Sequence, residues 1–324
     1  MSLRNKKILI TGGCGFIGSH LVRRLVNLRA KIFVIDNLIS SQILNIKDVL
    51  NKIKFFKISI TDYKKLKNIF SDYKFDFISH QAALVSVAES MEDPEEYIKV
   101  NIKGTLYLLE LARKNKVKKF VFASSSSVYG EKEKVYFKES DSPEPISIYA
   151  LTKLAGENLC NIFYKNFKLK TVSLRYFNVY GPFQSLKSQY ACVVPKFITC
   201  ILKEEPPPIY GDGKQSRDFV FVEDVVEANI LSFLNSQADG QIFNVATGRA
   251  YSVLELLDIL KEISNKKIKP LFCKPRPGDV FYTRASLKKA KKILGFIPKV
   301  SFKRGLKITF DWFRKNTWFW KIQF

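Results

Sequence analysis

The stretch Thr11-Gly12-Gly13-Cys14-Gly15-Phe16-Ile17-Gly18 decides the fold that this sequence predicts. It follows the strand-like run Lys7–Thr11 and opens the helical pattern Phe16–Leu28. Glycines at 12, 15 and 18 permit a tight turn and a close approach of a pyrophosphate to the backbone. The helix N-terminus adds N–H donors and a partial positive charge. The stretch therefore predicts the phosphate-binding turn of a dinucleotide site.

The elements around this turn predict an α/β fold. Short β-branched or aromatic runs alternate with helical patterns, which is typical of a parallel sheet. Further strands are predicted at Lys31–Asp36, Lys54–Ser59, Phe75–His80 and Lys119–Ser124. Long helices are predicted at Pro94–Asn115, with Asp93 as N-cap and Glu96 at the capping-box position, and at Ser147–Asn166. We expect a Rossmann-type doubly wound parallel sheet.

Loop signals divide the chain into two parts. From about residue 178 they become frequent, as in Gly181-Pro182, Pro206-Pro207-Pro208 and Pro275-Arg276-Pro277-Gly278. We predict a dinucleotide-binding domain over residues 1–177, with some later segments returning to it. Residues 178–324 are predicted to form mainly a smaller substrate-binding lobe at the C-terminal end.

The charge is unusual for a chain of 324 residues. Its 54 Lys and Arg outnumber its 30 Asp and Glu, which gives a formal net charge of +24. Such a balance is found in proteins that bind nucleic acid or anionic membranes. The lysines are spread along the whole chain, however, and no RNA- or DNA-binding motif accompanies them. We therefore predict no nucleic-acid partner and expect the positive field to steer an anionic substrate.

Other residue patterns exclude further classes. The five cysteines are scattered without a Cys-x-x-Cys pair, and His20 and His80 are the two histidines, so we predict no protein-bound metal. No run approaches the ~20 apolar residues of a membrane span, and Met1–Lys7 has no signal-peptide core. We predict a cytoplasmic protein with reduced cysteines and no stable membrane insertion.

Asp36 indicates which dinucleotide is bound. It ends the second predicted strand, where a carboxylate can bind the ribose hydroxyls of the adenosine. The same charge repels a 2′-phosphate. NAD is therefore the predicted cofactor, and NADP is disfavoured.

Three side chains downstream are candidates for catalysis. Tyr149 and Lys153 are four residues apart on a predicted helix and share one face. A free tyrosine has a pKa near ~10, and a nearby ammonium would stabilise its phenolate. Ser125 ends a predicted strand, and ligands bind at the carboxyl ends of strands in open α/β sheets. Such pairs are common on helix surfaces, but with the glycine-rich turn upstream this one favours a catalytic role.

These motifs together resemble the extended short-chain dehydrogenase/reductase family. The resemblance continues through His80–Val87, Arg175–Pro182, Gly211-Asp212-Gly213 with Ser216-Arg217-Asp218-Phe219, and Arg276-Pro277-Gly278-Asp279. It runs from Lys7 to about Trp312 and is closest to UDP-hexose 4-epimerases that act on N-acetylated sugars. In that family the two arginine segments hold the diphosphate of a UDP-sugar, which is the substrate that the resemblance implies.

The resemblance implies a complete set of site residues. The catalytic residues are Tyr149, Lys153 and Ser125. The cofactor is expected at Gly12, Gly15, Phe16, Ile17, Gly18, Asp36, Asn37, Asp62, Gln81, Ala82, Ala83, Asn101, Tyr149, Lys153 and Tyr176. The substrate is expected at Ser86, Ser125, Ser126, Tyr149, Asn178, Cys192, Val193, Ile209, Arg217, Arg276, Asp279 and Thr283.

The reaction that the resemblance implies is epimerisation at C4 through a 4-keto sugar. Tyr149 takes the proton of the 4-hydroxyl, Ser125 hydrogen-bonds the same oxygen, and hydride passes from C4 to NAD and back to the other face. Related 4,6-dehydratases need an acidic pair where this chain has Ser126 and Ser127, and related decarboxylases need a glutamate in place of Ser127. Serine cannot replace an acid at neutral pH.

The preferred hexose has two interpretations. In the resembling epimerases the residue seven positions after the clamp arginine, here Thr283 after Arg276, borders the C2 substituent, and a tyrosine there narrows the pocket. The small Thr283 therefore favours UDP-GlcNAc and UDP-GalNAc and still admits UDP-glucose and UDP-galactose. Thr283 could instead be a surface residue on a strand after Gly278-Asp279, where β-branched residues are common. The alternative is a UDP-glucuronate 4-epimerase. Such enzymes tend to carry threonine in place of Asn178 and an arginine a few residues on, where this chain has Phe183-Gln184-Ser185-Leu186.

Three further expectations concern assembly and partners. The resemblance implies a homodimer in which Pro94–Asn115 and Ser147–Asn166 pack against their symmetry mates. The end of the chain, Trp312–Lys321, is predicted to pack on its own domain, with contact to a membrane surface as the alternative. A non-catalytic dinucleotide fold that binds RNA would fit the charge of +24, but the intact catalytic residues argue against it.

Overall fold

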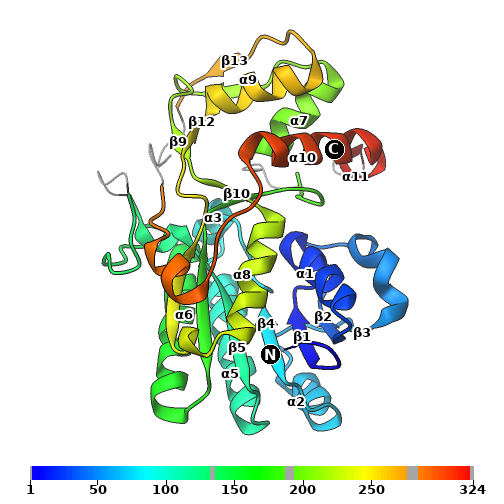
Figure 1. The fold of residues 1–324 in the computed structure, drawn as a ribbon, viewed down its shortest axis with the longest axis vertical. Helices are drawn as coiled ribbons and strands as arrows, with labels where there is room; N and C mark the ends of the chain where they lie inside the picture. The colour runs from blue at the N-terminus through cyan, green and yellow to red at the C-terminus, as the bar shows by residue number, and fades with distance from the viewer. Residues whose placement is uncertain (1, 132–135, 187–192, 276–283, 322–324) are drawn as a thin grey trace.

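A seven-stranded parallel sheet forms the centre of the protein. The computed structural model describes residues 2–131, 136–186, 193–275 and 284–321. The strands are β1 (Lys7–Thr11), β2 (Lys31–Ile35), β3 (Ile53–Phe56), β4 (Phe77–His80), β5 (Lys119–Ser125), β6 (Thr171–Tyr176) and β11 (Gln241–Val245). Their spatial order is β11-β6-β5-β4-β1-β2-β3, and every pair is parallel. The predicted Rossmann-type fold is confirmed (Figure 1).

The order of the strands reverses between β1 and β4. From β1 the chain builds outward to β2 and β3, then crosses to β4 and builds outward in the other direction. The segments that leave the carboxyl ends of β1 and β4 diverge there. Ligands of open α/β sheets bind at this kind of crevice. The topology therefore places the predicted dinucleotide turn, which follows β1, at the edge of the sheet where a ligand is expected.

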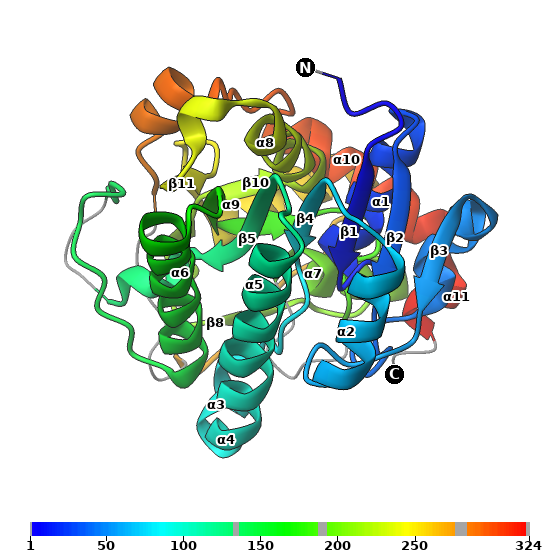
Figure 2. The same ribbon diagram turned by 90° about the horizontal axis from the view of Figure 1, so that it is seen from below.

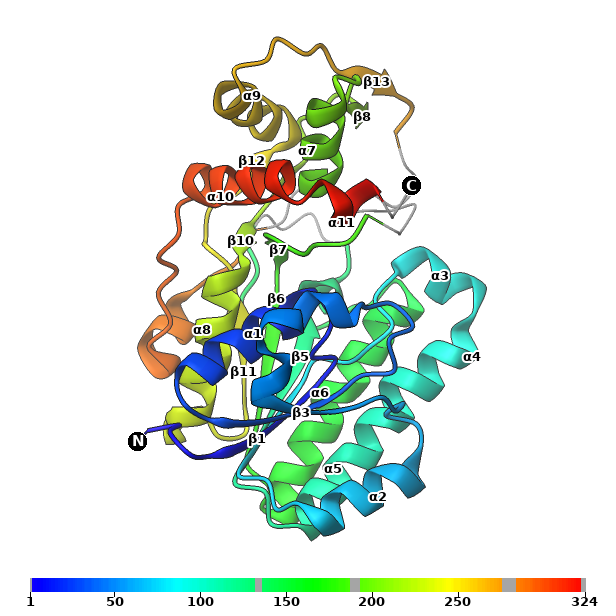
Figure 3. The same ribbon diagram turned by 90° about the vertical axis from the view of Figure 1, so that its right-hand side faces the viewer.

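Helices cover both faces of the sheet (Figure 3). One face carries α1 (Phe16–Asn27), α8 (Val222–Leu234) and η1 (Ile43–Lys52), and the other carries α2 (Tyr63–Asp72), α5 (Gly104–Lys114) and α6 (Ile148–Phe167). Each face has its own buried apolar cluster. Because both faces are covered, β1, β2, β4, β5 and β6 are buried along most of their length, and polar residues such as Ser173 and Arg175 of β6 are buried with them.

The long helix predicted at Pro94–Asn115 contains a π-helical turn. Its segments are α4 (Pro94–Tyr97), the π turn η2 (Ile98–Lys103) and α5, and the separate short helix α3 (Val87–Glu92) precedes it. The Asp93 side chain accepts a hydrogen bond from the Glu96 amide at 3.1 Å, so the predicted N-cap is confirmed. Glu96 pairs with Lys99 at 2.7 Å. Wider π turns occur mostly at functional sites, and this one carries Asn101.

Most of the chain after residue 178 forms a second group of elements. They are β7 (Asn178–Tyr180), α7 (Val193–Lys203), β8 (Pro208–Tyr210), β9 (Ser216–Arg217), β10 (Phe219–Phe221), β12 (Tyr251–Ser252), α9 (Val253–Ser264), β13 (Leu271–Cys273), α10 (Phe302–Lys315) and α11 (Thr317–Lys321). They enclose a separate apolar cluster that includes Ile209, Leu257 and Phe310. We propose that this cluster is the core of the substrate-binding lobe, while α8, β11 and η5 (Ala290–Leu294) pack with the first domain.

The end of the chain packs on the lobe. In α11, Phe319 and Trp320 are buried, and the Trp320 indole donates to the Phe313 carbonyl at 3.0 Å. The prediction of a terminal helix packed on its own domain is confirmed. No helix in the described part of the chain is long and apolar enough to cross a membrane. The two short turns η3 (Ser126–Tyr129) and η4 (Ser236–Ala238) complete the fold.

Candidate active site

The glycine-rich turn fits the pyrophosphate of a dinucleotide. Gly12 has φ +69°, and a Cβ there would lie 2.7 Å from the Ala82 amide nitrogen. A Cβ on Gly18 would lie 2.1 Å from the Gly12 carbonyl oxygen. At Gly15 a Cβ would meet only that carbonyl, at 3.2 Å, so this side of the turn is open. Gly15 caps α1 without a side chain, which leaves the first amides of the helix for an anion.

Asp36 lies directly behind this turn. Its Oδ2 accepts the Cys14 amide at 2.9 Å, and its Oδ1 accepts the Leu38 amide at 2.9 Å and the Ser41 hydroxyl at 2.7 Å. The carboxylate is buried beside the end of β2. A negative charge fixed here disfavours a second negative group on the ribose, in keeping with NAD. Its neighbour Asn37 uses its side-chain oxygen to accept the Ile39 amide at 3.2 Å.

The residues after β4 form a buried hydrogen-bonded network. The Gln81 amide group donates to the Tyr176 hydroxyl at 3.2 Å and to the Asn229 oxygen at 3.0 Å. Asn229 donates to the same tyrosine at 2.8 Å, and Ser79 donates to Asn229 at 3.1 Å. Two predicted cofactor residues, Gln81 and Tyr176, are thus brought together. The network fixes the start of the Gln81–Ala83 loop at the crevice, because it ties Gln81 to Tyr176 on β6 and Asn229 on α8.

Asn101 joins this loop to α6, the helix of Tyr149 and Lys153. Its side-chain oxygen accepts the Leu84 amide at 2.9 Å, and its amide group donates to the Leu84 carbonyl and the Thr152 hydroxyl, both at 3.0 Å. Thr152 lies on α6 beside Lys153. These bonds occupy the carboxamide within the protein. We therefore infer that Asn101 serves the site by holding the loop at a fixed distance from α6.

Tyr149 and Lys153 lie together on the first turns of α6. Ser147 caps this helix by accepting the Ala150 amide at 3.2 Å. The Lys153 ammonium lies 5.9 Å from the centre of the Tyr149 ring and donates to the Ala123 carbonyl at 2.8 Å. Burial lowers the pKa of Lys153 from its usual 10.5 to about 8. Tyr149 is half-buried at the start of this helix.

Ser125 has a hydroxyl proton available for a ligand. It ends β5 and caps η3, and its Oγ accepts the Ser127 amide at 3.2 Å and the Ser127 hydroxyl at 2.9 Å. A hydroxyl has two acceptor positions and one donor. With both acceptor positions used, the remaining group is the O–H donor. Because α6 packs on β5 and η3, the structure brings Ser125 to the same end of the sheet as Tyr149.

A buried ion pair behind these residues was not among the predicted site residues. Glu157 accepts two hydrogen bonds from Arg175, at 2.9 and 2.8 Å, and one from the Ser124 hydroxyl at 2.5 Å. Arg175 also stacks over the Tyr129 ring, 4.6 Å from its centre. Glu157 lies one helical turn after Lys153, and that spacing is the sequence signal for it. With Ser124, the pair ties α6 to β5 and β6, one helical turn from Lys153.

His80 is part of the structural core. Its two ring nitrogens lie 2.7 Å from the Thr11 hydroxyl and 2.9 Å from the Thr105 hydroxyl. Burial lowers its pKa to about 3, so the ring is neutral at physiological pH. In the described ranges, no group of three or more His, Cys, Asp or Glu side chains could hold a metal ion.

The described substrate residues fall into two places. Ser86 caps α3, and its amide donates to the Tyr97 hydroxyl at 3.0 Å. Both α3 and η3, which carries Ser126, pack against α6, so Ser86 and Ser126 are brought toward the helix of Tyr149. The remaining residues belong to the lobe. They are Asn178 in β7, Val193 in α7, Ile209 in β8 and Arg217 in β9.

Asp218 anchors the lobe side of the site. It is buried and accepts the Thr247 amide and hydroxyl, the Gly248 amide and the Ala285 amide, at 2.7 to 3.1 Å. Its carbonyl accepts the Asn178 amide at 3.1 Å. Asp218, which directly follows Arg217, therefore ties this part of the chain to the start of β7 at Asn178. The predicted substrate residues Cys192, Arg276, Asp279 and Thr283 lie outside the described residues. Asp62, which was predicted to bind the cofactor, caps α2 by accepting the Lys65 amide at 3.1 Å.

Comparison with known proteins identifies the family. Residues 8–246 match the profile of the NAD dependent epimerase/dehydratase family. The chain belongs to this family. NAD is therefore its cofactor, and the residues at the crevice fit it: the open turn at Gly15, the uncapped start of α1 and the fixed carboxylate of Asp36.

Relatives within the family differ in substrate. The structure of a UDP-glucose 4-epimerase from Thermotoga maritima with UDP-glucose is 41% identical, with a TM-score of 0.91, and covers 96% of this chain and 99% of that chain. A UDP-N-acetylglucosamine 4-epimerase from Methanobrevibacter ruminantium is 37% identical, with a TM-score of 0.92 and coverage of 97% and 99%. A UDP-glucuronate 4-epimerase from Thermodesulfobacterium geofontis is 34% identical, with coverage of 95% and 96%. The chain is thus an enzyme of the UDP-sugar epimerase/dehydratase type.

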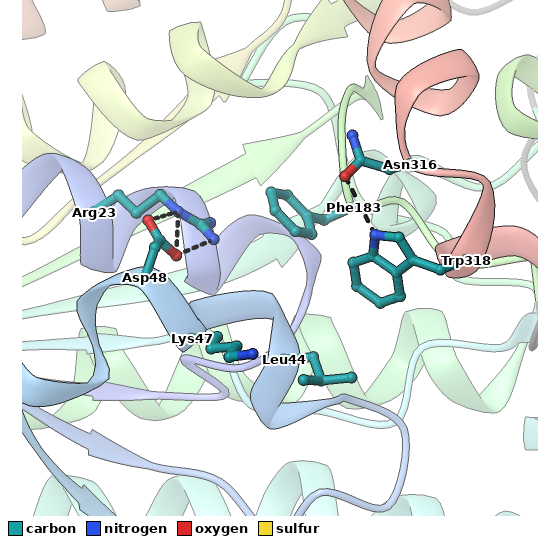
Figure 4. A pocket seen from close by; sticks show the side chains of 7 residues that line it. All are labelled: Arg23, Leu44, Lys47, Asp48, Phe183, Asn316 and Trp318. Carbon is teal, nitrogen blue, oxygen red and sulfur yellow. Dashed lines mark hydrogen bonds and ion pairs between the residues drawn. The ribbon is translucent and has the colours of Figure 1, made fainter.

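One open hollow is lined by none of the predicted catalytic residues. It has a volume of about 520 Å³ and is lined by Arg23, Leu44, Lys47, Asp48, Phe183, Asn316 and Trp318 (Figure 4). Arg23 is held by Asp48 at 2.7 Å and stacks on Phe183 at 4.4 Å. The Arg23 guanidinium and the Phe183 ring are thus already used to hold α1 against the lobe. We therefore assign no ligand to this hollow.

Proposed function

We propose that this enzyme is a UDP-hexose 4-epimerase that interconverts UDP-GlcNAc and UDP-GalNAc, with UDP-glucose and UDP-galactose as a second substrate pair. The observation that carries the proposal is the arrangement of Tyr149, Lys153 and Ser125 at one end of the sheet, with serines at 126 and 127. A base, a cation and a hydrogen-bond donor converge there, and no acid accompanies them on η3.

The roles of the three residues follow from their surroundings. Tyr149 takes the proton of the sugar 4-hydroxyl and later returns it to the 4-keto oxygen. Lys153, when protonated, stabilises the phenolate of Tyr149 through its charge. Ser125 donates its free O–H to the same sugar oxygen. NAD, when bound, supplies the acceptor and the donor for the hydride of C4.

The absence of an acid on η3 supports epimerisation over the related eliminations. Ser126 and Ser127 occupy the positions where dehydratases and decarboxylases of the resembling family carry acidic groups. The Ser127 hydroxyl donates to Ser125 at 2.9 Å, so it orients the catalytic serine. A serine hydroxyl cannot replace a carboxylic acid as the proton donor to a leaving group at neutral pH. An elimination would have no general acid at this place.

The choice of an N-acetylated sugar rests on the sequence at Thr283. A small residue there leaves room for the acetamido group while the keto sugar turns. Thr283→Tyr should abolish most of the UDP-GlcNAc turnover and spare UDP-glucose, because overpacking costs on the order of 1–3 kcal/mol. The rival substrate is UDP-glucuronate, and Asn178 and the absence of arginine in 183–186 favour a neutral sugar. If Thr283→Tyr still turns over UDP-GlcNAc at the parental rate, the assignment of this sugar loses its support.

We propose further that the enzyme is a homodimer formed through α5 and α6. These helices lie side by side on the outside of the domain, as Figures 2 and 3 show. Leu151 and Ile162, eleven residues apart and therefore on one face of α6, are 44% and 47% exposed. Ile98 and Leu106 on the neighbouring helical run are 44% and 37% exposed. Apolar side chains gathered on two adjacent helices suit a protein interface.

The proposed reaction can be tested by offering UDP-GlcNAc, UDP-glucose and UDP-glucuronate separately and resolving the products. The proposal predicts UDP-GalNAc and UDP-galactose and no epimer of UDP-glucuronate. Tyr149→Phe is the matched control, because it keeps the ring and removes the base, and turnover should fall at least ~100-fold. Turnover of UDP-glucuronate alone would overturn the proposal in favour of the rival.

A further inference from the structure

The far end of the lobe carries an exposed basic and apolar segment that the proposed reaction does not use. The segment is Asn265-Lys-Lys-Ile-Lys-Pro-Leu-Phe-Cys-Lys274, which contains four lysines and no carboxylate. It includes β13, which Figures 1 and 3 place at the end of the molecule farthest from the main sheet. We refer to it as the tip segment.

The tip segment is held by its backbone and by the side chains of Ile268 and Lys266. β13 pairs in parallel with β8, with Leu271 opposite Pro208 and Phe272 opposite Ile209. The Leu271 amide donates to the Pro207 carbonyl at 3.0 Å. Ile268 packs against the apolar core of the lobe. The outward side chains are therefore presented by an ordered strand and turn.

Two large apolar side chains lie in the solvent at this tip. Leu271 and Phe272 are each 57% exposed. They follow one another on a strand, so they project from its two faces, and this strand has a single partner in the described structure, β8. Two neighbouring bulky side chains that are more than half exposed lose hydrophobic stabilisation unless something covers them.

Lysines flank this apolar pair in the sequence. Lys267, Lys269 and Lys274 are exposed and have no carboxylate partner among the described residues. A shallow hollow of about 410 Å³ beside them is lined by Lys266, Lys267, Ile268 and Lys269, and by Glu204 and Pro206. Its one lining carboxylate, Glu204, is bound by Lys266 at 2.9 Å. The hollow thus has unpaired positive charge next to exposed apolar surface.

We propose that the tip segment docks the enzyme on the surface of an anionic lipid bilayer. Phe272 and Leu271 would enter the boundary between headgroups and acyl chains, and the lysines would contact the anionic headgroups. A second copy of this chain would bring the same lysines together, so self-association is disfavoured. A nucleic acid would use the lysines but offers a leucine no apolar phase. The association is peripheral and reversible, because one apolar pair cannot anchor a protein permanently.

Vesicle sedimentation with the full chain tests this proposal. Vesicles of phosphatidylglycerol and phosphatidylcholine in equal parts should bind the protein, binding should fall with added salt, and vesicles of phosphatidylcholine alone should bind at least about tenfold less. Lys267→Gln with Lys269→Gln should weaken binding at least about tenfold, since each lysine near the surface is worth on the order of fivefold. Leu271→Ser with Phe272→Ser should also weaken it by about tenfold or more.

Matched controls separate the tip segment from the general charge. Lys64→Gln with Lys67→Gln removes the same charge from exposed positions on α2, and Ile297→Ser removes an apolar side chain that is 61% exposed elsewhere. Both should bind vesicles as the parent does. Turnover of a UDP-sugar in solution should be unchanged in every variant, which shows that the variants are folded.

Three results would overturn the proposal. The parent could bind neither kind of vesicle, or the tip variants could bind as tightly as the parent and the α2 control. A single-stranded RNA that binds at physiological salt, and loses binding in the same tip variants, would assign the segment to nucleic acid instead.

Discussion

Lys153→Met should make the enzyme inactive and more stable at neutral pH. The ammonium of Lys153 is buried, and burial lowers its pKa from the usual 10.5 to about 8. Between these two pH values the unfolded chain binds more protons than the folded chain. The free energy of unfolding contributed by this group therefore rises as pH increases through that window. Below about pH 8 the folded protein bears the full cost of the buried charge.

The size of the effect follows from the two pKa values. A difference between 10.5 and about 8 corresponds to about 3 kcal/mol, since one pH unit is worth about 1.4 kcal/mol. Methionine removes the charge and keeps a similar length, but it loses the hydrogen bond to the Ala123 carbonyl, worth about 1 kcal/mol. The net gain in the free energy of unfolding is then about 2 kcal/mol near pH 7. By about pH 10.5 the gain should be gone.

Urea unfolding followed by circular dichroism, at about pH 7 and at about pH 10.5, measures the difference in the free energy of unfolding between Lys153→Met and the parent. Lys165→Met, an exposed lysine on the same helix, is the control and should change the free energy of unfolding by less than about 0.5 kcal/mol. Turnover of Lys153→Met should fall at least ~100-fold, because no cation would then lie beside the Tyr149 phenol. This account of Lys153 would be refuted if the difference in unfolding midpoint between variant and parent were the same at both pH values, or if the variant kept near-normal turnover.

Three further variants test other parts of the structure. Asp36→Asn keeps the acceptor oxygen but removes the charge, so the preference for NAD over NADP should fall at least about tenfold by calorimetry, and an unchanged ratio would remove Asp36 from the cofactor site. Glu157→Gln leaves Arg175 buried without a charge partner and should lower the free energy of unfolding by about 3–5 kcal/mol in urea. Glu110→Gln at the surface is the control and should lower it by less than about 1 kcal/mol. Equal effects would show that the buried pair does not stabilise the protein around the site. Leu151→Glu places a charge on the exposed apolar face of α6 and should convert a dimer into a monomer in light scattering, while a parent that is already monomeric would contradict the proposed assembly.

The local parts of the fold and site could be predicted from the sequence. The glycine-rich turn, the strands around it and the shared face of Tyr149 and Lys153 depend on residues close together in the chain, where periodicity and turn chemistry decide the structure. The N-cap at Asp93 was predicted for the same reason. These features needed no knowledge of packing.

The parts that join distant segments could not be predicted in this way. Glu157 and Arg175 lie eighteen residues apart and meet because α6 packs on β5 and β6. Asp218 bonds Thr247 and Ala285 across the lobe, and nothing local in its sequence shows which partners it has. The π turn at Asn101 is similar, because hydrogen bonds to Leu84 and Thr152 accompany a wider turn that residue propensities alone do not reveal.

The most direct test of the proposed reaction is the fate of a label at C4. UDP-GlcNAc that carries deuterium at C4 is incubated with the enzyme in ordinary water, and the UDP-GalNAc formed is analysed by mass spectrometry. If hydride leaves C4 and returns to the opposite face within one bound complex, as Tyr149, Lys153 and Ser125 imply, the product keeps the deuterium. Product in which solvent hydrogen has replaced the label, or no product from any UDP-hexose, would contradict the assignment of this protein as a 4-epimerase.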